Sequence, residues 1–355
     1  MRVLCITPSL AKCGPNVVVS EITKSLNNSK NDSVDLMFLD DKCQGVEFQC
    51  DTKKFSWSLL KDYLTGNLVF NYDVVHSHGF RPDIIAVLIK IILILKSKNK
   101  HVRFVTTIHN YVFKDLYYSR GVISSIFFGA LWSFLWMLFD NCVVLSEHAK
   151  KYYWFLGWKS IVINNGTSVP DVVNKFDLRG LFNIPKDSIL IGCCANITKI
   201  KGLDIIINSL SKDENIYFFI MGEGVDKNNL IDLVNSLNLE NKVFFLSSSD
   251  YPYSFIASLD IFVVPSRSEG FGLTIVEAAL LGIPVILSNI PIFKELFIGL
   301  GNYIELKPSR DIIETIKETY SSKSKISEVA ISIVENKFTS QVMVERYSQL
   351  YRYPF

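Results

Sequence analysis

The chain has 355 residues, the length of about two average domains. Hydrophobic residues make up 49% and charged residues 20%, which excludes intrinsic disorder and allows a large buried core. The 37 basic and 35 acidic side chains leave a net charge of +2, so composition gives no reason to expect nucleic acid as a partner. Seven cysteines form no CxxC pair, which indicates neither a zinc site nor a disulfide framework and favours a reducing compartment.

Short apolar runs alternate with longer amphipathic stretches in the first half of the chain. Such alternation predicts buried parallel strands separated by helices. The predicted strands are Val3–Ile6, Val34–Leu39, Asp73–His76, Val102–Ile108, Cys142–Leu145 and Ser160–Ile163. Turn and breaker residues follow between Gly166 and Asp187, and we place the end of a first domain at residue 167.

A second series of strands begins after this boundary. Its predicted strands are Ile189–Cys194, Ile216–Met221, Val243–Leu246, Ile261–Val264 and Pro284–Leu287. Helices are predicted over Leu203–Leu210, Leu230–Leu237 and Leu273–Leu281. The pattern from Ser309 to the end of the chain predicts successive helices. Two such series predict an α/β protein with two doubly wound, Rossmann-like domains, the second covering residues 168–338.

One uncharged segment, Gly121–Phe139, is long and apolar enough for a transmembrane helix. The strands on either side of it are expected to be neighbours in one sheet, and a span would place them on opposite sides of the bilayer. We therefore reject a span and favour a buried crossover helix. The alternative is a helix with one face on the sheet and an aromatic face in the bilayer interface. Small residues that predict close packing recur every four positions, at Ser125, Gly129 and Ser133.

The densest chemical signal lies between residues 265 and 279. A strand ends there, a loop with two glycines follows, and a helix begins. The free N–H groups of such a helix start bind anions, and glycines let the backbone approach a phosphate closely. Glu269 in the loop and Glu277 in the helix are suited to accept hydrogen bonds from sugar hydroxyls on either side of a diphosphate. The alternative is a plain turn with two surface glutamates.

The stretch from Ser266 to Ala278, SRSEGFGLTIVEA, resembles the Glu-x7-Glu motif of the retaining glycosyltransferases of family 4. Further resemblances are Lys201-Gly202, Met221–Gly224, Asn165-Gly166, Gly14 and Thr107–His109. The family has the GT-B fold, so the resemblance implies two Rossmann-like domains facing each other across a cleft. It also implies that a C-terminal helix, residues 339–355, crosses back to the first domain.

The resemblance implies a role for each matching residue. Glu277 would bind the ribose and Glu269 the transferred sugar, while Lys201 and the start of the helix would bind the diphosphate. The implied reaction-centre residues are Glu269, His109 and Lys201. The implied donor-binding residues are Gly14, Asn196, Lys201, Gly222, Glu223, Glu269, Gly270, Phe271, Gly272, Leu273, Thr274 and Glu277. Asn196 is a departure, because the family has arginine there, and Lys199 is a candidate replacement for the missing charge.

No Asp-x-Asp pair occurs in the sequence, so we expect transfer without a metal ion or other cofactor. His76 and His78 flank Ser77 and are interpreted as a pair of loop histidines rather than metal ligands.

The predicted activity is transfer of a sugar, with retention, from a nucleotide-sugar (a UDP-sugar) to a saccharide acceptor. The apolar first domain favours a lipid-linked acceptor and peripheral contact with the inner face of the cytoplasmic membrane. The composition, rich in Asn, Lys and Ile, resembles that of bacterial surface-polysaccharide (O-antigen or capsule) transferases. Two alternatives stay open: a nucleotide-sugar epimerase of the same fold, and a catalytically silent GT-B scaffold.

Overall fold

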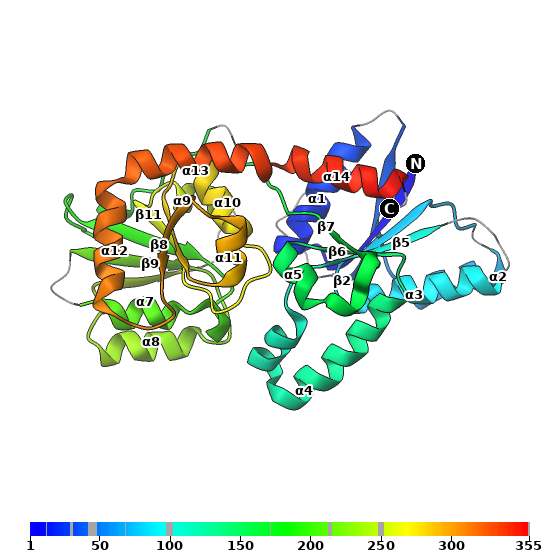
Figure 1. Ribbon diagram of the computed structural model, residues 1–355, viewed down its shortest axis with the longest axis horizontal. Coiled ribbons are helices and arrows are strands. Elements are labelled where there is room, and N and C mark those ends of the chain that lie inside the picture. Colours follow the sequence, from blue (N-terminus) through cyan, green and yellow to red (C-terminus); the bar gives the residue numbers. More distant parts are fainter. Residues whose placement is uncertain are drawn as a thin grey trace. The chain divides into compact units, whose positions relative to one another are not determined.

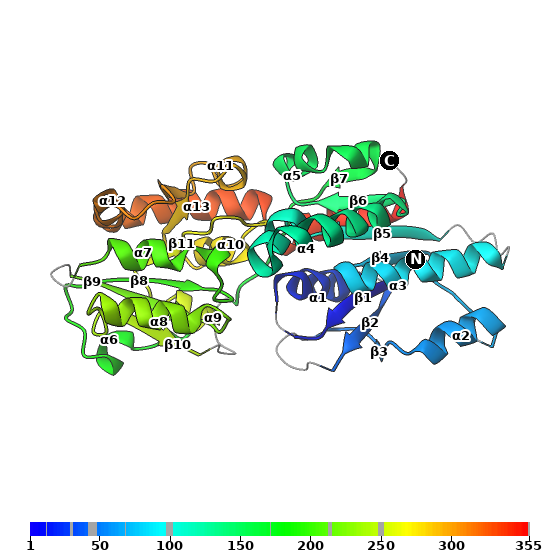
Figure 2. The ribbon, with the colours of Figure 1, turned by 90° about the horizontal axis from the view of Figure 1, so that it is seen from below.

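The computed structural model describes residues 1–11, 13–28, 31–41, 48–67, 69–96, 102–170, 172–211, 215–247 and 252–353. The chain forms two compact units. The first unit joins Met1–Thr167 to Phe338–Phe355, and the second is Ser168–Lys337. In each unit a parallel sheet carries helices on both faces (Figures 1 and 2).

The sheet of the first unit has the strand order β3-β2-β1-β4-β5-β6-β7. Its strands are β1 (Arg2–Ser9), β2 (Ser33–Asp40), β3 (Thr52–Lys54), β4 (Val74–Ser77), β5 (Arg103–Ile108), β6 (Asn141–Val144) and β7 (Ser160–Val162). All six predicted strands are present, with ends shifted by up to three residues. β3 was not predicted, because its three residues are polar and exposed at the sheet edge. The order reverses between β1 and β4, where ligands bind in doubly wound folds.

The helices of the first unit follow the amphipathic stretches. They are α1 (Gly14–Asn27), α2 (Trp57–Thr65), α3 (Phe80–Leu95), α4 (Val112–Met137), α5 (Glu147–Tyr152) and α14 (Ser340–Arg352), with a 3₁₀ segment η1 (Trp154–Lys159). On α1, the predicted face of Val18, Ile22 and Leu26 is buried. α14 lies against α1, so the C-terminal helix belongs to the first unit.

Buried polar contacts hold α14 on the sheet. His76 on β4 bonds Tyr351 of α14 through Nδ1 (2.6 Å) and Thr107 of β5 through Nε2 (2.8 Å). The Thr107 hydroxyl in turn lies 3.0 Å from the hydroxyl of Tyr347, also on α14. All four side chains are buried, so each hydrogen bond satisfies groups that would otherwise be costly to bury.

α4 corrects the prediction of a buried crossover helix. It does connect β5 and β6, which are paired neighbours in one sheet, so the expectation that led us to reject a membrane span is met. Only 17% of its most apolar 18-residue window is buried, however, although by length and composition alone it could cross a membrane. Its inner face packs against α3 rather than being enclosed.

Gly121 divides α4 into two arms, as Figure 1 shows. Its φ of 81° and ψ of 180° are not helical. The arms fold back on each other, because Ser125 Oγ donates to the carbonyl of Phe113 (2.6 Å) and the Phe113 ring lies directly over Gly129. Two of the three small residues predicted for close packing, Ser125 and Gly129, thus contact the other arm. The longer arm, residues 122–137, is about 24 Å long, short of a bilayer core of about 30 Å.

The sheet of the second unit has the order β10-β9-β8-β11-β12-β13. Its strands are β8 (Ile189–Cys194), β9 (Ile216–Met221), β10 (Val243–Leu246), β11 (Ile261–Val264), β12 (Val285–Ser288) and β13 (Gly301–Ile304). Four predicted strands match to the residue and a fifth is shifted by one. β13, a four-residue edge strand, was missed. The order reverses between β8 and β11, and continuous apolar runs bury these strands on both faces.

The helices of the second unit are α6 (Leu178–Leu181), α7 (Leu203–Ser209), α8 (Lys227–Ser236), α9 (Pro252–Ile256), α10 (Leu273–Leu280), α11 (Pro291–Leu296), α12 (Arg310–Ser321) and α13 (Lys323–Lys337). A short 3₁₀ turn, η2 (Lys199–Lys201), follows β8. The predicted helix at residues 230–237 begins three residues earlier than expected, at Lys227.

Candidate functional site

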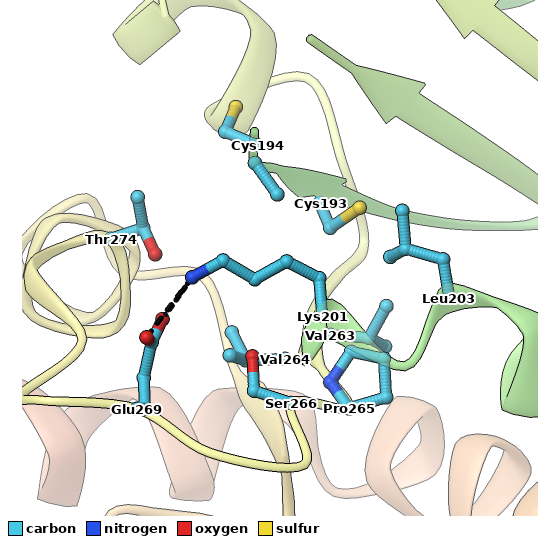
Figure 3. A pocket seen from close by; sticks show the side chains of 11 residues that line it. Cys193, Cys194, Lys201, Leu203, Val263, Val264, Pro265, Ser266, Glu269 and Thr274 are labelled. Carbon is cyan, nitrogen blue, oxygen red and sulfur yellow. Dashed lines mark hydrogen bonds and ion pairs between the residues drawn. The ribbon is translucent and has the colours of Figure 1, made fainter. Parts of the chain in front are cut away.

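The strongest candidate site lies where β8 and β11 of the second unit run side by side. Both strands are parallel, so the loops that follow them leave the sheet at the same edge. The loop after β8 carries Lys201, and the loop after β11 carries Glu269 and leads into α10. Figure 3 shows the open pocket between the two loops. It is lined by Cys193, Cys194, Ala195, Lys201, Leu203, Val263, Val264, Pro265, Ser266, Glu269 and Thr274.

Lys201 and Glu269 meet in this pocket. The Lys201 Nζ donates to both carboxylate oxygens of Glu269, at 2.7 and 3.0 Å (Figure 3). The two side chains are 22% and 18% exposed, so both are reachable from solvent without being free in it. The structure thus brings together two residues that belong to different motifs of the family resemblance and that both have implied places in the reaction centre.

The Lys201 turn is fixed by close backbone contact. Gly202 has φ +66°, and a Cβ there would lie 2.1 Å from the carbonyl oxygen of Pro265. Only glycine fits such a contact, since the neighbouring atom is backbone. The Lys-Gly pair therefore positions the lysine stem against the end of β11.

Arg267 ties the two loops together and was missed by the sequence analysis. Its backbone N–H donates to Ile200 O (2.7 Å) and its guanidinium to Lys199 O (2.7 Å). The same guanidinium binds both carboxylate oxygens of Asp204, at 2.8 and 2.7 Å. Asp204 lies in the first turn of α7. Planar bidentate pairing is specific to arginine, so Arg267 sets the position of the loop that carries Lys201.

The start of α10 has the geometry of an anion site. Gly272, its N-cap, has φ +101°, which favours glycine. First-turn N–H groups have no partner within the helix, so those of Leu273 and Thr274 are suited to a phosphate. The Thr274 side chain faces the same pocket as Lys201 (Figure 3).

Glu277 lies on the buried side of α10, one to two turns from its start. The residue is 9% exposed, and Tyr253 donates a long hydrogen bond to Oε1 (3.5 Å). Neither Glu277 nor Glu269 is therefore an ordinary surface glutamate. A buried carboxylate needs hydrogen-bond donors, which ribose hydroxyls could supply.

The side chain of Phe271 is not available to a ligand, in contrast to its place among the predicted donor-binding residues. It is 3% exposed and makes an edge contact with Phe297, with ring centroids 5.7 Å apart. Any contribution of Phe271 is limited to its backbone. Gly270, which precedes it in the loop, is only partly exposed.

The remaining predicted residues of the second unit lie around the loop after β8. Gly222 has φ +146°, and a Cβ there would lie 1.9 Å from Ala195 O, so the glycine turn packs on this loop. The Glu223 carbonyl accepts from Ile197 N (2.8 Å), whereas its side chain is 55% exposed and pairs with Lys227 at 2.9 Å. Asn196 and Lys199 are both exposed near the Lys201 turn.

The first unit carries a histidine cluster at the carboxyl edge of its sheet. His109 follows β5 directly, and its Nε2 lies 2.9 Å from Nδ1 of His78. His76 lies on β4, which corrects its interpretation as a loop histidine, whereas His78 lies in the loop after this strand, as predicted. Both side chains are buried. Burial lowers the pKa of all three imidazoles, that of His76 and His109 to about 3. The three rings are therefore neutral at physiological pH.

Gly14, the first residue of α1, lies at the same edge of this sheet as the histidines and is exposed. Asn16 in the same turn was not predicted. Its amide donates to Ser9 O (2.8 Å) and Ala11 O (2.6 Å), which fixes the loop after β1. The Asn16 side chain thereby holds the backbone that leads to Gly14.

Comparison with known proteins covers both units. Residues 174–332 match the family described as glycosyl transferases group 1, and residues 50–169 match glycosyltransferase family 4. The O-antigen biosynthesis glycosyltransferase WclY of Escherichia coli is 42% identical over 360 residues, 99% of this chain and 98% of that protein.

Two solved structures share the fold. Anabaena Alr3699/HepE in complex with UDP-glucose aligns over 99% of each chain with a TM-score of 0.76 and 18% identity. Sucrose-phosphate synthase from Thermosynechococcus elongatus aligns over 99% of this chain and 98% of its own, with a TM-score of 0.77 and 16% identity.

Proposed function

This chain belongs to glycosyltransferase family 4 and has the GT-B fold, and we propose that it transfers a sugar from a UDP-sugar to a lipid-linked saccharide in surface-polysaccharide (O-antigen) biosynthesis. The O-antigen assignment is supported by its 42% identical relative, which is an O-antigen biosynthesis glycosyltransferase. The UDP-sugar assignment is supported by a structural relative that was solved with UDP-glucose.

The observation that carries the proposal is the pocket between the loops after β8 and β11. It combines a cation, Lys201, with the N-terminus of α10 and the largely buried carboxylate of Glu269. A second buried carboxylate, Glu277, lies on α10 outside the lining of the pocket. Fixed dipoles and a cation stabilise the charge that develops on a leaving diphosphate. The carboxylates accept hydrogen bonds from hydroxyls of the transferred sugar and the ribose.

A panel of nucleotide-sugars tests this function. The full-length protein is incubated with each one, with and without lipid-linked acceptor, and the release of nucleotide diphosphate is measured. Acceptor-dependent release supports transfer. Isomerised nucleotide-sugar would indicate an epimerase. No reaction with any donor would favour a binding or scaffold protein.

We further propose that transfer retains the anomeric configuration and needs no metal ion. Retention follows from the Glu-x7-Glu resemblance. Metal independence is motivated by the absence of Asp-x-Asp from the sequence and by the cation at Lys201. NMR of the product gives the anomeric configuration, and an inverted product contradicts retention. Activity that collapses in EDTA and returns with Mg²⁺ or Mn²⁺ contradicts metal independence.

We propose that the longer arm of α4 contacts the inner face of the cytoplasmic membrane, which also gives access to a lipid-linked acceptor. Its exposed apolar side chains are Val122, Ile123, Ile126, Phe127, Leu131, Phe134 and Met137. A cation lies at its C-terminal end, where Lys159 binds Met137 O (2.7 Å). Lys90, which binds Leu138 O (2.9 Å), is also paired with Asp140 at 2.7 Å. Trp158, 76% exposed, lies beside Lys159. Apolar and aromatic side chains bordered by cations are typical of helices in the interface of an anionic bilayer.

Flotation with phosphatidylglycerol vesicles tests this contact. The double change Phe127→Ser and Phe134→Ser should abolish flotation. Val225→Ser, which removes an even more exposed apolar side chain from the second unit, should not affect it. High salt or alkaline carbonate should release the native protein from membranes, whereas release by detergent alone contradicts peripheral binding.

A further inference from the structure

His78 has a buried ring nitrogen without a hydrogen-bond partner among the described residues. The residue is 1% exposed, and the unpartnered atom is Nε2. Its other nitrogen, Nδ1, lies 2.9 Å from Nε2 of His109. Only one hydrogen can lie between two ring nitrogens at this distance, so one neutral ring donates and the other accepts.

Two neutral arrangements satisfy this contact. In the first, His78 donates from Nδ1, and its buried Nε2 is a bare lone pair. In the second, His109 donates from Nε2, and the neutral His78 must carry its hydrogen on Nε2, where no acceptor meets it. A buried N–H without an acceptor is rarer in proteins than an under-satisfied acceptor, so the first arrangement is favoured.

His76 does not alter this choice. Its ring lies close to that of His78, with centroids 4.1 Å apart, but both of its nitrogens already have partners on Tyr351 and Thr107. A shared extra proton between His78 and His109 is disfavoured as well, because burial and the neighbouring imidazoles lower the pKa of His78. The pair therefore holds one hydrogen between its rings and one on the Nδ1 atom of His109.

We propose that His78 is a positioning residue that fixes His109 in the tautomer protonated at Nδ1, so that His109 meets the substrate as a hydrogen-bond donor. His109 is partly exposed and can touch a sugar or phosphate oxygen, whereas the buried His78 acts only through it. The substrate contact rests on the proposed function. The tautomer does not, because it follows from contacts within the first unit.

Nitrogen NMR of the full-length protein tests the tautomer directly. The chain has five histidines, so ¹⁵N-histidine labelling gives a spectrum simple enough to assign with a His109→Asn variant. We expect His109 to show a protonated Nδ1 and an unprotonated Nε2 at neutral pH without substrate. The opposite pattern overturns the proposal, whether or not the protein is active. The expected pattern in a protein without transferase activity would instead count against the proposed function.

Two substitutions of His78 test its effect on turnover. The amide nitrogen of asparagine takes roughly the place of Nδ1, and that of glutamine the place of Nε2. His78→Asn should therefore keep the His109 tautomer and most of kcat. His78→Gln should no longer hold His109 in the tautomer protonated at Nδ1. It should lower kcat two- to tenfold, the range for losing one neutral hydrogen bond, with donor KM nearly unchanged.

Equal kcat values and equal His109 spectra for the two variants would reduce His78 to a structural role and overturn the proposal. Thermal unfolding of both variants shows whether they fold. If neither folds, the spectrum of the native protein still decides the tautomer.

Discussion

Lys201 and Glu269 act as each other's counter-ion in the pocket of the second unit, with Nζ 2.7 and 3.0 Å from the two carboxylate oxygens. The resemblance to family 4 assigns them to different parts of the donor, the diphosphate and the transferred sugar. If Lys201 binds the diphosphate as the resemblance implies, an incoming donor competes with the Glu269 carboxylate for the lysine. The ion pair holds the lysine in place before the donor arrives.

Lys201→Ala should weaken the binding of free UDP about ten- to a hundredfold, the usual loss for a charge-assisted hydrogen bond. Glu269→Gln should leave UDP affinity unchanged or raise it, because it removes the competing carboxylate. Isothermal titration calorimetry on the native protein and both variants measures the difference. A similar loss of affinity in both variants would show that the pair acts as one unit in nucleotide binding.

Glu277 and Glu269 should fail differently when each is changed to alanine. Glu277→Ala removes the proposed contact to the ribose, which does not react, so donor KM should rise and UDP should bind more weakly. Glu269→Ala removes the proposed contact to the reacting sugar and should lower kcat, with UDP affinity unchanged or raised. Each loss should be about ten- to a hundredfold. If UDP affinity falls only in Glu269→Ala, the donor has been assigned in the wrong orientation.

Arg267→Lys should lower kcat/KM about three- to tenfold, because lysine cannot bind both oxygens of Asp204 and the Lys199 carbonyl together. Asp204→Asn should produce a similar loss, and the double variant should lose little more than either single one. Steady-state kinetics measures all three. The control Lys323→Gln removes an exposed ion pair with Asp260 and should have no effect on kinetics. Additive losses from Arg267 and Asp204 would contradict a shared role.

The second unit could be predicted in detail because its strands are continuous apolar runs bounded by breakers. The pocket could be predicted only in part. Glu269, Glu277 and Lys201 carry recognisable local patterns, but the Lys201–Glu269 pair joins residues 68 positions apart. Such pairs depend on β8 and β11 becoming neighbours in the sheet. Local hydrophobic periodicity does not predict the order of the strands. For the same reason the bidentate pairing of Arg267 with Asp204 could not be predicted from the sequence.

The first unit was predicted less well where its chain departs from regular periodicity. The segment from Gly121 is uniformly apolar, so its composition could not show which face is buried. Gly121 itself was the available signal, since a glycine inside a helical pattern can mark a break. The contact of His78 with His109 depends on β4 and β5 lying side by side, as they do in the sheet.

Acid should destabilise the first unit through His76. The native pKa of this fully buried histidine is about 3, and that of an unfolded histidine is about 6.5. Between these values the unfolded chain binds more protons, so the stabilisation is complete above pH 6.5 and falls as pH drops. For His76 the loss from pH 7 to pH 5 is about 2 kcal/mol.

Asp83 opposes this effect. Burial raises its pKa from 3.8 to about 6, so the native protein binds a proton at Asp83 before the unfolded chain does. By pH 5 this offsets roughly 1 kcal/mol of the stability that His76 loses.

Urea unfolding followed by tryptophan fluorescence isolates the first unit, because all five tryptophans lie there. His76→Gln should reduce the fall in stability between pH 7 and pH 5. An unchanged pH dependence in this variant would contradict the assignment to His76.

Gly121→Ala should destabilise the α4 hairpin by about 1–3 kcal/mol. Gly121 has φ +81° and ψ 180°, a region of backbone space reserved almost entirely for glycine. A Cβ there meets no atom within 4 Å, so the cost arises from the backbone alone. Gly129→Ala acts differently, because its Cβ would lie 2.5 Å from the Phe113 ring of the other arm. Urea unfolding followed by tryptophan fluorescence measures both variants, since Trp132 and Trp136 lie on the longer arm.

The double variant distinguishes an opened hairpin from a strained one. If Gly121→Ala straightens α4, Phe113 moves away from Gly129, and adding Gly129→Ala should then cost almost nothing more. If the arms stay folded together, the two costs should add, because the residues share no contact. We expect a strained but closed hairpin, since the buried side of the longer arm is anchored to α3 by hydrogen bonds from Trp132 and Trp136 to Asp83, at 2.7 and 3.0 Å. A strongly non-additive result would show that the bend at Gly121 is what keeps the two arms together.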